Sequence, residues 1–263
     1  MASNRECPRC RLMRGGRSRL RRIGMPEDRA VVVSVEGVEK DFHSLRPLRV
    51  KHLQLHEAEI IALLGFDQAA AEVLVNLVAG ATLPDKGEVL IRGRSTASIP
   101  DGEAWMKALD EFGIVSERAI LLDQMTVEQN LAVPLTLELH DLPSAIREQV
   151  AALADEVHLE RTRLPLFVAT LAPLDRLRLR LARALAINPR IVLAEHPNAS
   201  VPPDATATLA ADLAEVAQRR RLSMLIITAD PDFAEAVAPQ VLQLNGATGE
   251  LTAIKRGWRR WFS

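Results

Sequence analysis

Short apolar runs rich in β-branched residues alternate with helical patterns along most of the chain, and this alternation limits the folds open to it. Strands are expected over residues 31–35, 60–64, 191–194, 224–228 and 241–244, with two more over 87–93 and 251–254. Helical periodicity separates them, most clearly over residues 69–80, 204–221 and 231–237. Apolar strands joined by helices are typical of a parallel sheet covered on both faces. We therefore predict an α/β fold with a mostly parallel sheet core.

A helical block interrupts this alternation in the middle of the chain. Residues 101–112 and 127–159 are mostly helical in pattern, with breaks at Pro134 and Pro143, and a basic helix follows over 173–187. The block predicts an inserted helical lobe over about residues 115–187, within one domain that spans residues 25–254.

Both ends of the chain differ from this domain. Residues 1–24 carry eight arginines and one glutamate without periodicity, so we expect a disordered basic leader, with Met25 as an alternative start that the intact mass would test. Cys7 and Cys10 lie in this leader, and a metal site would need a second pair of ligands that the sequence lacks. Residues 255–263 mix basic and aromatic side chains, which indicates either contact with a membrane or partner, or tryptophans packed on their own domain.

Composition excludes several classes of protein. The formal net charge of -1 gives no reason to expect nucleic acid as a partner. No apolar stretch approaches the ~18–20 residues that a membrane span needs, and the first residues do not form a signal peptide. The low cysteine content is typical of a cytoplasmic protein. We expect a cytoplasmic chain that reaches the inner face of the membrane only through a partner.

Several short motifs follow one another in an order that indicates a known family. LLG at residues 63–65 precedes a helix ending in LVAG at 77–80, and LPDKGEV follows at 83–89. Further along stand MTVEQNL at 125–131, LARAL at 181–185, IVLA at 191–194 and IIT at 226–228. In register over about residues 31–254, this set resembles the ATPase subunit of ABC transporters. The resemblance implies a P-loop NTPase-like cassette with an N-terminal antiparallel β portion. It also implies ATP and Mg²⁺ as ligands, and a membrane permease subunit and a second cassette as partners.

The phosphate-binding loop of this family is altered here. A P-loop reads G-x-x-x-x-G-K-[ST], in which glycine N–H groups and a lysine hold the phosphates and a hydroxyl binds Mg²⁺. Residues 65–73 read GFDQAAAEV: Gly65 is kept, but Ala70, Ala71 and Glu72 replace the second glycine, the lysine and the hydroxyl, and Val73 follows. Asp67 and Glu72 add negative charge where a polyanion would lie. We expect Glu72 to interact with the helix N-terminus as a first-turn carboxylate.

The other motifs that touch nucleotide in the family are altered as well. At the position of the family's Mg²⁺-sensing glutamine the sequence has Ser116 or Glu117. The signature that clamps the γ-phosphate from the opposite subunit reads Ala172, Pro173, Leu174 and Asp175, which keeps a helix start, because proline suits a first turn, but loses the hydroxyl and the glycines.

The strand over 191–194 leads into the remaining site positions. Glu195 takes the place of the Mg²⁺ ligand and can still bind a cation, while His196 and Ala229 replace the catalytic glutamate and the switch histidine. His196 has two interpretations, a proton acceptor or a histidine fixed by backbone hydrogen bonds. Phe42 matches the aromatic residue that stacks on adenine, and a core role is the alternative.

Three functions stay open on these residues. The first is a cassette subunit of an ABC transporter-like complex with weak or no hydrolysis, and therefore a regulatory or structural role. The second is a scaffold protein that has left transport. The third is a divalent-cation site formed by Glu72, Glu117 and Glu195, unless these carboxylates pair with an arginine such as Arg118.

Overall fold

The computed structural model describes residues 29–254. The basic leader predicted over residues 1–24 and the tail 255–263 lie outside the described residues, as do Cys7, Cys10 and Met25. No helix of the described part is both long and apolar enough to cross a membrane.

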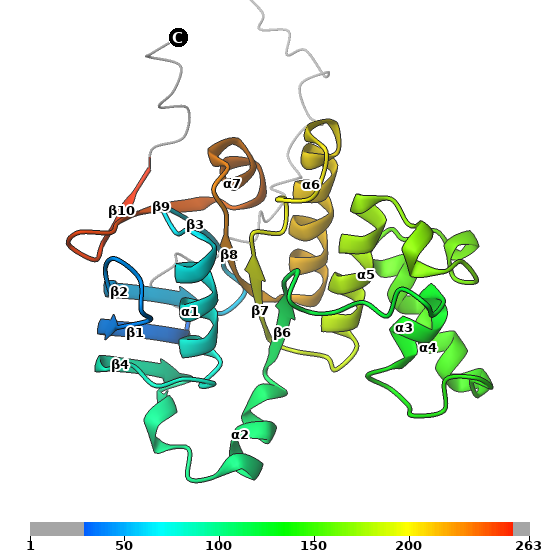
Figure 1. Ribbon diagram of the computed structural model, residues 1–263, viewed down its shortest axis with the longest axis horizontal. Coiled ribbons are helices and arrows are strands. Elements are labelled where there is room, and N and C mark those ends of the chain that lie inside the picture. The colour runs from blue at the N-terminus through cyan, green and yellow to red at the C-terminus, as the bar shows by residue number, and fades with distance from the viewer. Residues whose placement is uncertain (1–28, 255–263) are drawn as a thin grey trace, which may run out of the picture.

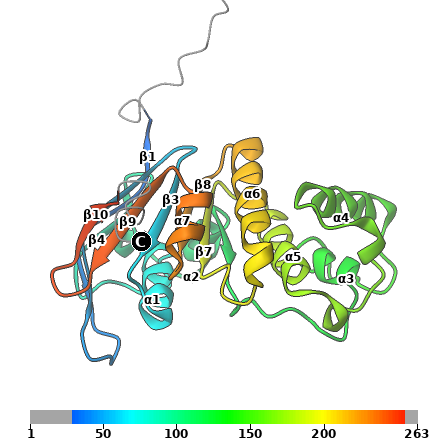
Figure 2. The same cartoon turned by 90° about the horizontal axis from the view of Figure 1, so that it is seen from above.

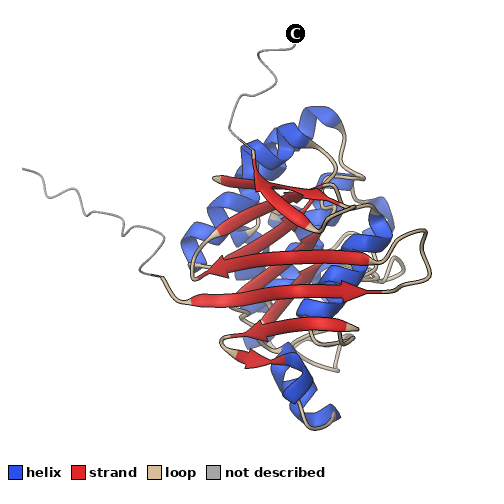
Figure 3. Cartoon of the chain, turned by 90° about the vertical axis from the view of Figure 1, so that its left-hand side faces the viewer, coloured by secondary structure: helices blue, strands red, loops and turns tan. Residues whose placement is uncertain are grey.

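Two β-sheets form the scaffold (Figure 1). The smaller sheet is antiparallel, in the order β2-β1-β4-β5. The larger has the order β10-β9-β3-β8-β7-β6, and all its neighbours are parallel except β10 and β9. Figure 3 shows the strands of the two sheets crossing. The strands are β1 (Val31–Lys40), β2 (Leu48–His56), β3 (Ile60–Leu64), β4 (Lys86–Ile91), β5 (Arg94–Ser95), β6 (Phe112–Val115), β7 (Ile191–Glu195), β8 (Ser223–Ile227), β9 (Gln240–Asn245) and β10 (Glu250–Ala253).

The helices cover both faces of the larger sheet and build the lobe. The α-helices are α1 (Gln68–Val78), α2 (Gly102–Leu109), α3 (Val127–Ala132), α4 (Ser144–Glu156), α5 (Pro173–Leu185), α6 (Pro203–Arg220) and α7 (Pro231–Val237). Short 3-10 turns are η2 (Thr96–Ser98), η3 (Arg161–Arg163) and η4 (Val168–Thr170). Seen from above, α3 and α4 lie at one end of the molecule, with α5 and α6 between them and the sheet (Figure 2). The predicted α/β fold and its helical lobe are thus present.

Strand β3 explains why the central strands are continuously apolar. All five of its residues are buried, and they alternate between two cores. Ile61 and Leu63 face the core that holds α1 and the smaller sheet, while Ile60, Ala62 and Leu64 face the core of the helical lobe, α6 and α7. Because both faces of this strand are covered, no position in it favours a polar side chain.

The helical expectation for residues 101–112 is only partly correct. Helix α2 ends at Leu109, and Phe112 begins β6, which pairs in parallel with β7 and forms the edge of the larger sheet. Gly113 allows α5 to pack closely on this strand, because a Cβ there would lie 2.9 Å from the carbonyl oxygen of Ala184 in α5. This strand carries the chain to the carboxyl end of β7, where the candidate site lies.

Candidate functional site

The turn between β3 and α1 closes tightly and begins the helix early. Gly65 has φ +87°, and a Cβ there would lie 2.8 Å from the Leu244 carbonyl oxygen. Helix α1 starts at Gln68, so Ala70 already belongs to the helix and does not have a positive φ. The Asp67 carboxylate caps this helix and accepts a hydrogen bond from the Ala70 N–H at 2.7 Å. The chain's own carboxylate therefore occupies the helix N-terminus.

The expectation for Glu72 is wrong. The first turn of α1 holds no acidic residue, because the helix begins at Gln68 and Glu72 falls in its second turn. Asp67, one residue before the helix, makes the interaction that was expected of Glu72. Glu72 instead turns toward Arg118.

This turn gives a first testable prediction. Gly65→Ala should lower the free energy of unfolding by about 2–3 kcal/mol, because the new Cβ meets the Leu244 carbonyl in a backbone that L-residues avoid. Gly93→Ala is the matched control: Gly93 has φ +76° but open space around it, so about 1 kcal/mol is expected. Urea unfolding measures both, and equal losses would show that the contact with Leu244 is unimportant.

One arginine joins the acidic residues of the site. The Arg118 guanidinium donates to Glu195 from Nη2 at 2.7 Å and Nε at 3.2 Å, and from Nη1 to Glu72 Oε1 at 3.2 Å. Gln68 Nε2 donates to Glu195 Oε1 at 2.6 Å. The Glu195 side chain is fully buried, whereas that of Arg118 is 38% exposed. We name this set, Gln68, Glu72, Arg118 and Glu195, the Arg118 network.

The sheet topology brings Arg118 to this place. Strands β6 and β7 run in parallel with Val115 beside Ala194, so the residues that follow each strand meet at the same edge. Ser116 Oγ accepts a hydrogen bond from the Arg118 N–H at 3.1 Å and shapes the turn. Hydrogen bonds to Glu195 raise the pKa of the Arg118 guanidinium, and burial opposes them. Arg118 therefore stays charged.

The predicted cation site does not form. Glu72 and Glu195 flank the guanidinium of Arg118, and Glu117 is exposed. Over residues 29–254 no group of three or more histidine, cysteine, aspartate or glutamate side chains is placed to hold a metal ion. A guanidinium between two carboxylates satisfies the charges that would otherwise attract a cation, so the arginine alternative is the correct one.

His196 follows Glu195 in a strained and buried position. Its φ is +44°, and its N–H donates to the Ile227 carbonyl at 2.8 Å. The ring Nε2 is buried and has no hydrogen-bond partner among the described residues. The backbone is fixed as the second interpretation requires, but the ring is not. Beyond it, Thr228 donates to Asn198 Oδ1 at 2.8 Å, just before Ala229.

The signature positions keep a helix start, as expected. Helix α5 begins at Pro173, and Ala172 precedes it without a side-chain cap. Leu174 packs partly buried against the lobe core. Asp175 lies in the first turn and pairs with Arg178 at 3.4 Å. The carboxylate thus interacts with its own helix.

Phe42 fits both of its interpretations. It packs partly buried against the core that holds α1. It also lines a cavity of about 360 Å³ next to the β3–α1 turn, together with Gly65, Asp67, Ala70 and Leu244. Val73 packs partly buried against the same core. A cavity is therefore present beside the turn, with the Asp67 carboxylate in its wall.

The sequence match agrees with this geometry. Residues 48–199, more than half of the chain, match the family described as ABC transporter. The chain therefore belongs to the ABC transporter family. This stretch includes the β3–α1 turn, the whole Arg118 network and the signature positions.

Individual members of the family are similar over most of this cassette. The sulfate/thiosulfate import ATP-binding protein CysA of Synechococcus elongatus is 28% identical over 227 residues, which covers 84% of this chain and 62% of that protein. The lipoprotein-releasing system ATP-binding protein LolD of Alcanivorax borkumensis is 29% identical over 211 residues, covering 80% of this chain and 91% of that protein. This chain therefore spans less than two thirds of CysA but nearly all of LolD.

A solved structure supports the cassette fold. The dimeric structure of a bacterial ABC transporter cassette has a TM-score of 0.70 to this chain at 20% identity, and the match covers 85% of this chain and 99% of that one. At this identity the similarity is evidence for the fold alone.

The sequence predicts no role for Gln68 and offers Arg118 only as a possible partner of the cluster Glu72, Glu117 and Glu195. The signal for Gln68 was its place at the start of the helix that follows the strand over 60–64. The signal for Arg118 was its place after the apolar residues 112–115, in parallel with 191–194. The contacts of both residues depend on the order of the strands in the sheet, which local sequence patterns do not reveal.

Proposed function

We propose that this chain is a non-hydrolysing cassette subunit of an ABC transporter-like complex, with a structural or regulatory role. The Arg118 network is the observation that supports it most. One guanidinium holds Glu195 and Glu72, and these are the residues that the family resemblance aligns with Mg²⁺-binding positions.

The anion side of the site does not fit a triphosphate. The Asp67 carboxylate already accepts a hydrogen bond from the Ala70 N–H. N–H groups at a helix N-terminus are the donors that bind phosphate, so this donor is occupied. Ala71 supplies no positive charge and is fully buried. A phosphate about 4 Å from Asp67 would be repelled by about 1–4 kcal/mol, depending on solvent screening. Nucleotide binding is therefore expected to be weak.

The cation side does not fit Mg²⁺ either. Both Glu195 oxygens accept hydrogen bonds from Arg118 or Gln68. An octahedral Mg²⁺ would have to displace the guanidinium from a fully buried carboxylate. Arg118 does not attract the phosphates of a nucleotide either, because it faces two carboxylates and the three charges sum to about -1. His196 stands where the resemblance places the catalytic glutamate, with its ring Nε2 buried.

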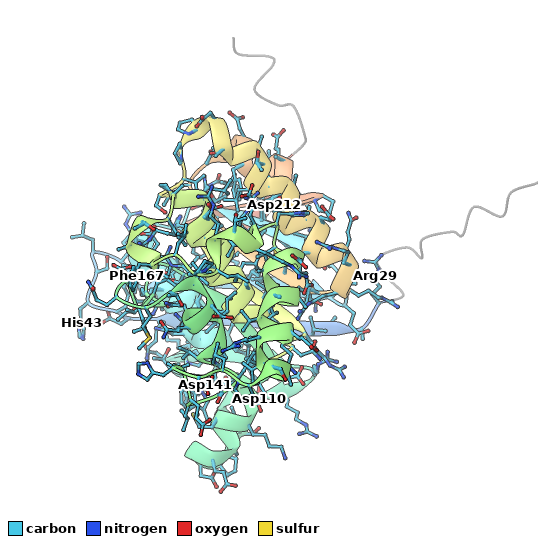
Figure 4. All side chains as sticks on the ribbon, turned by 90° about the vertical axis from the view of Figure 1, so that its right-hand side faces the viewer. Arg29, His43, Asp110, Asp141, Phe167 and Asp212 are labelled. Carbon is cyan, nitrogen blue, oxygen red and sulfur yellow. The ribbon has the colours of Figure 1, made fainter. Side chains whose placement is uncertain are left out.

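The helical lobe carries an apolar surface suited to a partner. Ile120 is 76% exposed and Phe167 56% exposed, and each has an exposed leucine near it in the chain, Leu122 and Leu166. The two segments lie side by side, because the Ala169 N–H donates to the Asp123 carbonyl at 3.3 Å. Figure 4 shows Phe167 on the lobe side of the molecule. We name these four residues the lobe patch. Exposed apolar patches mark protein interfaces, so this one supports docking of a membrane permease subunit.

The lobe patch is built on fixed backbone. Asn130 is fully buried and exchanges hydrogen bonds with the Leu122 backbone, at 2.9 Å to its N–H and 3.0 Å to its carbonyl. Arg183 Nη1 donates to the Ile120 carbonyl at 2.7 Å. The Val127 N–H donates to the Leu166 carbonyl at 2.9 Å. A patch held in this way needs little ordering to bind.

This proposal places the chain in the cytoplasm, at the inner face of the membrane through its partner. The relatives' names describe them as ATP-binding proteins of import and lipoprotein-releasing systems, which supports a role in a transport complex. A second cassette with an intact P-loop would complete the assembly and carry the hydrolysis. The permease would determine which substrate the complex transports.

Purification of the tagged chain from its native cells tests the proposal. We expect a permease and a second cassette to co-purify. Phe167→Asp should lower their recovery by about tenfold or more, because a charge would be desolvated in an apolar contact. Leu83→Asp is the matched control, an exposed leucine outside the lobe, and should leave recovery unchanged. Recovery of the chain without any membrane protein would favour a scaffold protein that has left transport.

A further inference from the structure

A second cavity, larger than the one beside Phe42, lies under α2. It measures about 630 Å³, opens to solvent, and is lined by the end of α1, strands β4 to β6, η2 and α2. Helix α2 lies at the bottom of Figure 1, below β4 and β6. None of its lining residues belongs to the cavity beside Phe42 or to the Arg118 network. The cavity under α2 is therefore separate from the residues on which the proposed function rests.

The wall of the cavity opposite α2 is apolar. Val78, Ala79, Ile91, Ile99 and Phe112 line it. Such a wall favours the burial of an apolar ligand body, and it is typical of small-molecule sites.

Helix α2 covers this cavity without filling it. Its lining residues Ala104, Lys107 and Ala108 are spaced three and four apart and lie on one face. Two of them are alanines, and no residue of α2 is buried. The helix is tethered by Trp105, whose Nε1 donates to the Ala79 carbonyl at 3.1 Å. The space beneath α2 is thus bounded on both sides but lacks large side chains.

A buried hydroxyl in the wall lacks a partner. Thr96 is 5% exposed, and its Oγ1 is buried without a hydrogen bond among the described residues. Leaving a buried polar group unpaired destabilises a protein, so such a group calls for an explanation. Thr96 lines the cavity but its Oγ1 is closed off from solvent, so a polar ligand atom pairs with it only if the side chain rotates toward the cavity.

The rim of the cavity is basic. Arg92 pairs with Glu111 at 3.1 Å and with Glu57 at 3.2 Å, and the single negative charge that these three side chains leave is outweighed by Arg94 and Lys107. Arg94 and Lys107 also line the cavity, and neither forms an ion pair within residues 29–254. The charges left at the rim therefore attract an anion.

We propose that the cavity under α2 binds a small amphipathic carboxylate, with its apolar body against Ile91 and Phe112 and its carboxylate at the rim near Arg94 and Lys107. On binding, the Thr96 side chain rotates so that its Oγ1 donates a hydrogen bond to this ligand. The ligand completes the packing between α2 and the sheet.

Calorimetry and thermal unfolding of the full chain with 4-phenylbutyrate test the proposal. We expect a Kd of about 0.1–1 mM and a rise in Tm. Two analogues of the same shape, 4-phenylbutanol and 4-phenylbutylamine, should bind at least about tenfold more weakly, since they lack the anion. Absent binding of the carboxylate, or equal binding of the amine, would overturn the proposal.

Variants locate the site. Ala108→Phe fills the cavity and should abolish binding, and Ala104→Phe serves the same purpose if the first variant is unstable. Lys107→Glu should weaken binding about tenfold, whereas Lys51→Glu, on the opposite edge of the smaller sheet, should not. Thr96→Val should weaken binding while raising the Tm of the free protein, because it removes an unpaired buried hydroxyl. Unchanged binding in folded Ala108→Phe and Ala104→Phe would place the ligand elsewhere and overturn the proposal.

Discussion

Replacing Arg118 with alanine should lower the free energy of unfolding by about 2–3 kcal/mol, although the residue lies at a partly exposed position. The variant leaves the fully buried Glu195 carboxylate with Gln68 as its remaining side-chain donor. Removing one partner of a buried ion pair costs about 3–5 kcal/mol, and the exposure of Arg118 reduces this figure. Urea unfolding measures the loss.

Arg92→Ala is the matched control for this prediction. Arg92 also bridges two carboxylates and is similarly exposed, at 33% against 38% for Arg118. Its partners Glu57 and Glu111 are 51% and 38% exposed, so their charges stay solvated and about 0.5–1 kcal/mol is expected.

A second variant shows whether the buried charge of Glu195 causes the loss of stability. Adding Glu195→Gln to Arg118→Ala removes the buried charge and should restore part of the lost stability. If Arg118→Ala cost no more than Arg92→Ala, the Arg118 network would not be a buried ion-pair network.

Restoring the family's lysine should damage the fold without creating a nucleotide site. Ala71 is fully buried in the core shared by α1 and the smaller sheet. Ala71→Lys should lower the free energy of unfolding by about 3 kcal/mol or more, because it buries an ammonium group without a partner. Thermal or urea unfolding measures this loss.

Ala69→Lys is the control, two residues earlier on the same helix and exposed, and should change stability by about 0.5 kcal/mol or less. An Ala71→Lys variant of unchanged stability that gained Mg²⁺-dependent ATP binding would contradict the prediction. It would show that the side chain at position 71 reaches solvent and the phosphates.

The sequence patterns identified the fold because its central strands are buried on both faces. Runs such as 60–64 and 191–194 are continuously apolar for that reason, and the helices between them have clear starts and ends. Strand β6 is not predicted, because it has only four residues and begins two residues after the end of α2. The segment 101–112 therefore has the pattern of a single helix. Short edge strands leave little periodicity to detect.

The candidate site could be predicted in part. The altered loop, signature and strand-end residues were visible one by one. Their partners were not, because the pairing of Arg118 with Glu195 depends on the parallel register of β6 and β7. The sequence predicts the interaction with the helix N-terminus for Glu72 rather than Asp67, since the helical pattern begins at residue 69, one residue after the observed start at Gln68.

The central claim is that this cassette fills its own nucleotide site with Asp67 at the helix N-terminus and Arg118 at the acidic residues. Calorimetric titration of the full chain with ATP and Mg²⁺ tests it most directly. We expect no saturable binding with a Kd below about 1 mM, which corresponds to about -4 kcal/mol. One-site binding with a Kd of a few micromolar, dependent on Mg²⁺, would contradict the claim.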